Sequence, residues 1–433
     1  MGGWTDGRIG GQVEWRTDGR ADGFLEGVRI FLKVMMFRPE KFFGTVVFAA
    51  HVIAGTASAQ ERIQLPAPSG PYDVGVTYRR FTDTTRTDPL SSDLPRHRSL
   101  DVTVWYPAFQ GGTSASYYRH TDELESVFGA EYGVLLRSVE VNASLDPPAV
   151  RPPDRLPVVL FSHDIGGLSE HHSVFAEEFA SQGYVVVGIN HSYGSTITVD
   201  RRGRPYRTHE MWRETFPLTE RAESLRWSQL LEWVADILFV HRSLRLEHES
   251  EASFFTGRFD LSRVFLAGHG FGGAAALHAA QLDRRIRAVV ALDPDVEMGH
   301  LSLASEVPLL LIESDSSAAD VASQAARAGA TEASIRESNR YADFRRDSLL
   351  ARAPANSVGF VVNGASREAL SDLPVVVVSG ETQRTHAEEL ISGLRTVLVT
   401  FLAAQSGQAR HAEVVRLAEG FGWLRQVFRA ENP

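Results

Sequence analysis

The chain has 433 residues, of which 43% are hydrophobic and 23% are charged, a balance typical of globular proteins. Its formal net charge is −10 and it has no run of basic residues with interleaved aromatics, which argues against a nucleic-acid-binding surface. The chain contains no cysteine, so a disulfide framework and a lipid-modified cysteine are both excluded.

The first 60 residues have the layout of a secretory signal peptide. Residues 35–41 give a short basic start, residues 42–53 form an apolar run, and Ala57-Ser58-Ala59 is an A-x-A cleavage site. The apolar run is too short to span a bilayer, which needs about 20 apolar residues. The sequence therefore predicts cleavage near Ala59, a secreted or periplasmic protein, and no transmembrane span.

The segment before the signal peptide, residues 1–34, is rich in glycine and arginine and lacks periodicity. We interpret it as a non-native extension or a long n-region, with the signal peptide at 35–59 and the true start at Met35 or Met36. The rest of the chain, residues 60–433, is predicted to form a single domain.

Strands and helices alternate along this domain. A half-buried strand is predicted at 99–108 from its alternating pattern. Apolar runs at 157–161 and 184–190 are typical of parallel strands that are buried on both faces, and a helix at 172–183 separates them. A polar, arginine-rich excursion near 200–222 is expected to cover a site. The remaining predicted elements are a long helix at 225–244, strands at 263–268, 286–293, 308–314 and 358–362, and two C-terminal helices. This alternation predicts an α/β fold, a doubly wound and mostly parallel sheet with helices on both faces.

The stretch LAGHGFGGAA, residues 266–275, fits two different motifs. Its glycines match G-x-G-x-x-G, the loop that binds a dinucleotide pyrophosphate, and Asp293 lies near the position of the acidic residue of that motif. Replacing Gly270 by Ser would instead give G-x-S-x-G, the nucleophile elbow of serine hydrolases. The bulky His269 and the late position of the loop in the sheet count against a dinucleotide site.

The hydrolase interpretation accounts for more of the sequence. Small residues flank Gly270, as the close packing of strand and helix at an elbow requires. Asp293 follows the next strand, where a triad carboxylate belongs, and VVLFSHDIGG (158–167) ends an earlier strand, where an oxyanion-hole loop belongs.

These features fall within a broader resemblance. The stretches that carry it are LPAPSGPYDVG, VTVWYPA, PVVLFSHDIGG, FASQGYVVVGINHS, VFLAGHGFGGAAA, AVVALDP and VVNGASREALSDLP. In this order, over about residues 65–375, the chain resembles the bacterial relatives of platelet-activating-factor acetylhydrolase. The resemblance implies the α/β-hydrolase fold of secreted esterases and lipases, a lipid or ester ligand, and no cofactor.

The resemblance also assigns the site. Gly270 stands at the position of the nucleophilic serine, Asp293 at the triad acid, and Arg367 at the catalytic histidine. The backbone N–H groups of Ile165 and Phe271 would form the oxyanion hole. Nearby residues are His163, Asp164 and His269, of which Asp164 replaces a glycine of the family pattern.

The substituted residues lack the groups that a serine hydrolase needs for catalysis. Gly270 has no oxygen to attack a carbonyl, and Arg367 is permanently protonated and cannot act as a general base. A carboxylate at Asp164 would oppose the charge that an oxyanion hole stabilises. We expect Arg367 to pair with Asp293 and to fill part of the space that Gly270 leaves.

The sequence thus favours a catalytically inactive pseudo-hydrolase that retains a lipid- or ester-binding pocket. Two alternatives stay open. One is an active carboxylic-ester hydrolase with a non-standard nucleophile, and the other is a structural or partner-binding protein whose pocket is closed.

Other polar residues have simpler interpretations. His386 follows an apolar, strand-like run at 374–378 and is a candidate displaced base, although it would still lack a nucleophile. Ser162 is expected to make turn hydrogen bonds, and His163 and His191 to brace the backbone. The histidines and carboxylates have no spacing typical of a metal site, so none is predicted.

Overall fold

The computed structural model describes residues 62–91, 96–151, 155–215, 220–295, 307–315, 331–377 and 381–429. All of them belong to one compact unit that extends from Gly44 to Pro433. The predicted signal peptide at 35–59 and the segment before it lie outside the described residues.

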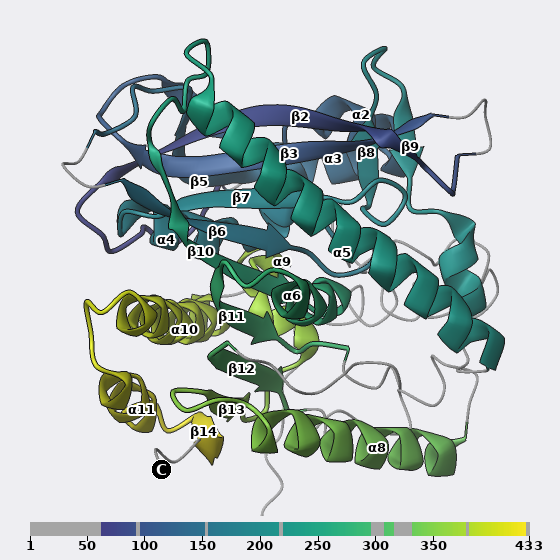
Figure 1. The fold of residues 1–433 in the computed structure, drawn as a ribbon, viewed down its shortest axis with the longest axis vertical. Helices are drawn as coiled ribbons and strands as arrows, with labels where there is room; N and C mark the ends of the chain where they lie inside the picture. Colours follow the sequence, from purple (N-terminus) through teal and green to yellow (C-terminus); the bar gives the residue numbers. More distant parts are fainter. Residues whose placement is uncertain are drawn as a thin grey trace, which may run out of the picture. The chain divides into compact units, whose positions relative to one another are not determined.

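Twelve of the described strands form one large mixed sheet in the order β1-β5-β2-β3-β7-β6-β10-β11-β12-β13-β14, with β4 paired to β5 (Figure 1). From β7 to β13 every neighbouring pair is parallel, whereas β2–β3, β3–β7 and β13–β14 are antiparallel. The bounds are β1 Ile63–Gln64, β2 Asp73–Thr87, β3 His97–Ala108, β4 Thr113–Ser116, β5 Val139–Leu145, β6 Leu156–Ser162, β7 Val185–Asn190, β10 Phe259–His269, β11 Ile286–Leu292, β12 Leu309–Ser314, β13 Val358–Val362 and β14 Leu424–Arg429.

Helices cover both faces of this sheet. The described α-helices are α2 Thr121–Phe128, α3 Ala130–Ser138, α4 Ser173–Ser181, α5 Glu220–Glu249, α6 Phe271–Leu282, α8 Glu332–Ala351, α9 Leu373–Val377, α10 Glu381–Gln405 and α11 His411–Glu419. The long helix α5 runs across the sheet, contacts β2 and β6, and packs on α6 (Figure 1). The predicted α/β class, with a doubly wound and mostly parallel sheet, is confirmed.

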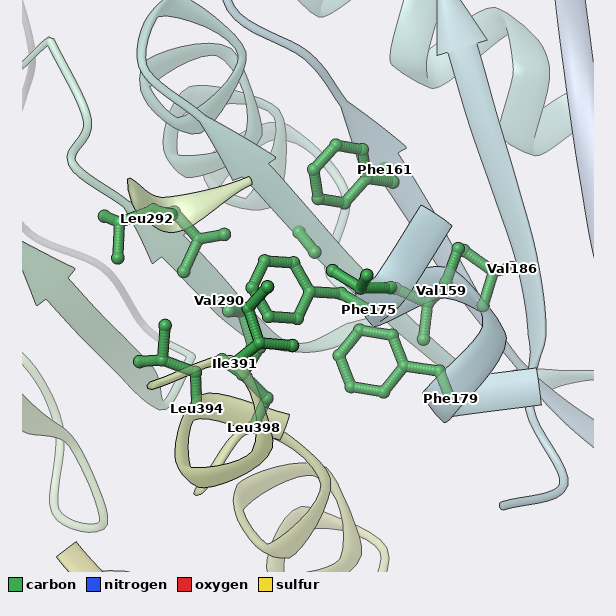
Figure 2. Close-up of a cluster of buried hydrophobic side chains, with 14 of the residues drawn as sticks. Val159, Phe161, Phe175, Phe179, Val186, Val290, Leu292, Ile391, Leu394 and Leu398 are labelled. Carbon is green, nitrogen blue, oxygen red and sulfur yellow. The ribbon is translucent and has the colours of Figure 1, made fainter. Parts of the chain in front are cut away.

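The core lies on the face that α4 and α10 cover. Figure 2 shows Phe175 and Phe179 of α4 between the sheet side chains and Ile391 of α10. Sheet residues such as Val159 and Val290 belong to the same buried cluster. The alternating positions of these strands are equally buried, because α6 covers the other face. This two-sided burial explains why the strands have continuous apolar runs.

Several features differ from the sequence-based expectations. The apolar run at 374–378 was predicted to be strand-like, but the structure has the helix α9 there. The strand at 358–362 was expected to be the last, yet β14 follows it. The long strand β2 has no apolar alternation along its outer half, because that half is only partly buried, and the prediction missed it.

The described part of the excursion near 200–222 also contains regular secondary structure. The strands β8 (Ile197–Val199) and β9 (Pro205–Arg207) pair as an antiparallel hairpin. The 3₁₀ helix η3 (Glu210–Thr215) follows this hairpin. Within the described residues, no helix is both long enough and apolar enough to cross a membrane.

The burial of α4 generates a prediction about stability. Phe175 is 1% exposed, so Phe175→Ala should lower the free energy of unfolding by about 3–5 kcal/mol through lost contacts and a residual cavity. Phe344→Ala is the matched control, because Phe344 is 65% exposed and its loss should change stability by no more than about 0.5 kcal/mol. Urea unfolding measures both, and equal losses would contradict this view of the core.

Candidate active site

The candidate residues meet at one edge of the sheet. Asp164 follows β6, Gly270 follows β10, Asp293 follows β11, and Arg367 begins the 3₁₀ helix η4 (Arg367–Leu370) after β13. The carboxyl ends of the parallel strands meet at this edge, which is where open α/β sheets hold their ligands. The structure therefore brings together the residues that the sequence singled out.

Gly270 forms a sharp turn between β10 and α6. Its φ of 56° and ψ of −122° lie in a region that L side chains rarely adopt and that glycine enters without steric penalty. The strand and helix approach closely here, because a Cβ on Gly268 would collide with the carbonyl oxygen of Gly272. This strand–turn–helix geometry is that of a nucleophile elbow.

The two backbone N–H groups expected in the oxyanion hole converge on one acceptor. Oδ1 of Asp164 accepts hydrogen bonds from the N–H of Ile165 at 2.8 Å and from the N–H of Phe271 at 2.9 Å. If these two N–H groups form an oxyanion hole, as the resemblance implies, Oδ1 of Asp164 occupies the position of an ester carbonyl oxygen. The sequence predicted an unfavourable charge beside these two N–H groups, whereas in the structure the carboxylate is hydrogen-bonded to both.

Arg367 holds the other oxygen of the same carboxylate. Its Nε donates to Oδ2 of Asp164 at 2.9 Å, and its Nη2 donates to Oδ1 of Asp295 at 2.6 Å. The predicted pairing of Arg367 with Asp293 is therefore wrong. Asp293 instead accepts a hydrogen bond from Oγ of Ser314 at 2.9 Å, and its charge acts on the guanidinium only at longer range.

Sequence reasoning missed Asp295 as part of the site. Its Oδ2 accepts from Nη2 of Arg226 on α5 at 2.6 Å, so Asp295 bridges Arg226 and Arg367. Burial acts to raise the pKa of Asp295, but the two guanidinium groups outweigh it and lower the pKa to about 2. The second carboxylate of the run Asp293-Pro294-Asp295 was the available signal.

The space of a nucleophile side chain is already filled. A Cβ on Gly270 would overlap Nη2 of Arg367 and the carboxyl group of Asp164. The expectation that Arg367 occupies part of this space therefore agrees with the structure. For Arg367, burial acts to lower the pKa, but Asp164 and Asp295 outweigh it and raise the pKa well above its usual value, so the guanidinium cannot serve as a base.

Buried histidines surround the elbow. His269 lies 3.1 Å from His172, measured between Nδ1 and Nε2, and burial lowers the pKa of both rings. Nε2 of His163 lies 2.8 Å from Oγ of Ser195. The candidate base His386 is exposed on α10. Within the described residues, no group of three or more His, Asp or Glu side chains could hold a metal ion.

A second set of residues makes a Ser–His–Asp chain. Oγ of Ser162 lies 2.7 Å from Nε2 of His191, and Nδ1 of His191 lies 2.9 Å from Oδ2 of Asp236. Asp236 also binds Arg98, with Nη2 at 2.6 Å from Oδ2. Ser162 is only 1% exposed, so its hydroxyl has no access to a substrate.

Comparison with known proteins identifies the family. Residues 57–382 match the family model described as platelet-activating factor acetylhydrolase, isoform II. The chain belongs to this family. Platelet-activating factor acetylhydrolases from Cavia porcellus and Bos taurus are 26% and 27% identical to it over 250 and 252 residues, each match covering 53% of this chain. The chain spans 55% of the length of each of these relatives.

The fold has a solved counterpart. A ferulic acid esterase from Streptomyces cinnamoneus superposes with a TM-score of 0.64 at 19% identity, covering 84% of this chain and 99% of the esterase chain. This similarity establishes the α/β-hydrolase fold. The family match includes the positions of Gly270, Asp293 and Arg367.

The filled elbow predicts that restoring a serine is destabilising. Gly270→Ser should lower the free energy of unfolding by at least about 1–3 kcal/mol, because the backbone is strained for an L residue and the new side chain displaces Asp164 and Arg367. Thermal and urea unfolding measure the change.

Substitutions at two further glycines distinguish the two causes of this destabilisation, backbone strain and steric overlap. Gly203 has a φ of 74° with open space around it, whereas Gly422 has open space and no positive φ. Gly203→Ser should show the strain alone, and Gly422→Ser should show neither effect. A Gly270→Ser protein as stable as Gly422→Ser would argue against an occupied elbow.

Proposed function

We propose that this chain is a non-hydrolytic member of the acetylhydrolase family, a pseudoenzyme in which an internal ion pair replaces the reactive centre. The observation that carries the proposal is the Asp164 carboxylate, which accepts hydrogen bonds from both Ile165 and Phe271 and binds Arg367. A hydrolase of this fold keeps these N–H groups available for the oxyanion of its tetrahedral intermediate.

For each step of ester hydrolysis, the site lacks the chemical group that the step needs. No side-chain oxygen at Gly270 can form an acyl intermediate. Arg367 cannot take a proton from a nucleophile or return one to a leaving group. The hole donors are occupied by a carboxylate, so an ester carbonyl gains no stabilisation there. Losing the serine or the histidine alone costs on the order of 10⁶ in turnover in a comparable triad.

The retained function is proposed to be binding of a lipid or ester without turnover. Family membership supports this choice of ligand, and the elbow lies at the sheet edge where such ligands bind. The rival is a structural or partner-binding protein whose pocket is closed. Fatty-acid and phospholipid binding assays on the full chain distinguish the two, since saturable binding is expected only of the first.

Export is part of the same proposal. The layout of residues 35–59 supports a signal peptide, with one domain following from residue 60. N-terminal sequencing of protein recovered from the periplasm or medium should give a start near Gln60. Retention of the full chain in the cytosol would contradict export without affecting the proposal for the site.

Stepwise restoration of the triad tests the catalytic part. Gly270→Ser alone should leave p-nitrophenyl acetate hydrolysis at background, because Arg367 supplies no base and Asp164 still fills the hole. Combining it with Arg367→His and Asp164→Gly should raise the rate about 10²-fold or more, since a general base and oxyanion donors each contribute at least about that factor.

The matched control replaces the serine by alanine. A Gly270→Ala, Arg367→His, Asp164→Gly protein has the same opened site without a hydroxyl, and it should stay at background. Turnover by the wild-type chain, or equal turnover by the serine and alanine triple variants, would show that the site has been assigned wrongly.

A second candidate function has one specific observation in its favour. The chain Ser162–His191–Asp236 has the hydrogen-bond pattern of a serine-hydrolase triad, which is the arrangement an active esterase with a non-standard nucleophile would need. Its burial favours a structural role, since burial lowers the pKa of His191 and keeps Ser162 from solvent.

Ser162→Ala tests this candidate. If the chain is structural, the substitution should lower the free energy of unfolding by about 1–3 kcal/mol, because buried His191 loses its partner. Neither wild-type nor variant protein should react with a fluorophosphonate probe. Labelling of the wild type that disappears in Ser162→Ala would establish an active hydrolase instead.

A further inference from the structure

A cavity of about 820 Å³, lined mostly by polar and charged residues, lies between the β2–β3 strand pair and the β8–β9 hairpin. None of its lining residues belongs to the site around Gly270. Arg80 lies on β2, Arg96 directly precedes β3, and Arg204 lies in the hairpin turn. The arginine-rich sequence near 200–222, expected to cover a site, contributes its first arginines to this cavity.

The charge of this cavity is opposite to that of the chain. Its described lining contains five arginines and three aspartates, which gives a local net charge of +2 in a chain whose net charge is −10. The arginines are Arg80, Arg96, Arg201, Arg202 and Arg204. Such a local excess concentrates anions.

The aspartates of the lining are committed to partners. Asp88 binds Arg98, and Asp101 binds Arg80. Asp200 accepts from the N–H groups of Arg202 and Arg204 through Oδ1 and from Tyr206 through Oδ2, all within 2.9 Å. Burial acts to raise the pKa of Asp200, but these hydrogen bonds outweigh it and lower the pKa below its usual range.

Two arginines of the lining have no such carboxylate partner. Arg201 and Arg202 are exposed on the hairpin turn, and neither forms a salt bridge within the part of the chain that the structure describes. The guanidinium carbon of Arg96 lies over the ring of Tyr206, 4.9 Å from the ring centroid. The cavity therefore combines fixed and unpaired guanidinium groups.

Backbone strain at the same cavity is an independent observation. Tyr193 lines it and has a φ of 61°, a conformation that costs a non-glycine residue energy and that clusters at ligand sites. The conformation is held by the Tyr193 carbonyl, which accepts from the N–H of His209 at 2.8 Å and from Nε1 of Trp212 at 3.0 Å.

We propose that this cavity binds a phosphate monoester. Guanidinium groups bind phosphate through paired hydrogen bonds, and a dianion matches the local charge of +2. The volume exceeds the need of inorganic phosphate alone, and the rings of Tyr193 and Tyr206 offer an apolar wall. The phosphate therefore belongs to a larger molecule, either a soluble phosphomonoester or the headgroup of a lipid.

Calorimetric titration of the full chain with glycerol 3-phosphate tests the proposal. Binding is expected to be saturable, to weaken as sodium chloride is added, and to be absent with glycerol. Arg201→Gln combined with Arg202→Gln should weaken binding about tenfold or more, since hydrogen bonds to charged groups are lost. Both side chains are exposed, so the fold is expected to survive.

The matched control is Arg242→Gln combined with Arg245→Gln, two exposed arginines of α5, which should leave binding unchanged. Vesicles of phosphatidylcholine with and without phosphatidic acid distinguish the two sources of the phosphate. Binding of glycerol 3-phosphate or of phosphatidic-acid vesicles that depends on Arg201 and Arg202 supports the site. Absence of both, or equal weakening by the control pair, would overturn it.

Discussion

The carboxylate of Asp164 satisfies two backbone N–H groups and one guanidinium at the same time. Through Arg367 and Asp295 this contact continues to Arg226 on α5. Segments that follow β6, β10, β11 and β13 are thereby joined by charge-assisted hydrogen bonds at the carboxyl edge of the sheet. Such bonds are shorter and stronger than neutral ones. This network therefore determines which polar groups at the carboxyl edge of the sheet are available to a ligand.

In active α/β-hydrolases the same scaffold serves catalysis with a nucleophile on the elbow, a general base and free N–H donors. In an α/β-hydrolase the elbow and the hole stay unoccupied until a substrate arrives, and their strain and unsatisfied donors are part of the mechanism. Here Gly270 relieves the strain and Asp164 satisfies the donors. In the proposed pseudoenzyme, Gly270 and Arg367 stand where the serine and the histidine are lost, and Asp164 occupies the N–H donors, so the three substitutions act on one site.

The sequence predicted the parts of the fold that depend on two-sided burial. The runs in β6, β7, β10 and β11 are apolar throughout because helices cover both faces. It could not predict the partly buried outer half of β2 or the pairing of β14, since neither segment alternates regularly between apolar and polar residues. An apolar run such as 374–378 fits a strand and a buried helix equally well.

The sequence singled out most residues of the candidate site, but it missed Asp295 and did not predict the contacts. Resemblance placed Gly270, Asp293 and Arg367 at one edge of the sheet. It gave no means to decide which of three nearby carboxylates Arg367 would bind, because that choice depends on side-chain geometry. Ser314 already engages Asp293, whereas Asp164 binds Nε and Asp295 binds Nη2 of the guanidinium.

Amide-proton NMR of an Asp164→Ala protein tests the central claim most directly. If the carboxylate occupies the hole, the amide resonances of Ile165 and Phe271 should both move markedly upfield in this variant, because each loses a charge-assisted hydrogen bond. Asp293→Ala should leave the two resonances nearly in place. Unchanged Ile165 and Phe271 resonances in Asp164→Ala would contradict an internally occupied oxyanion hole.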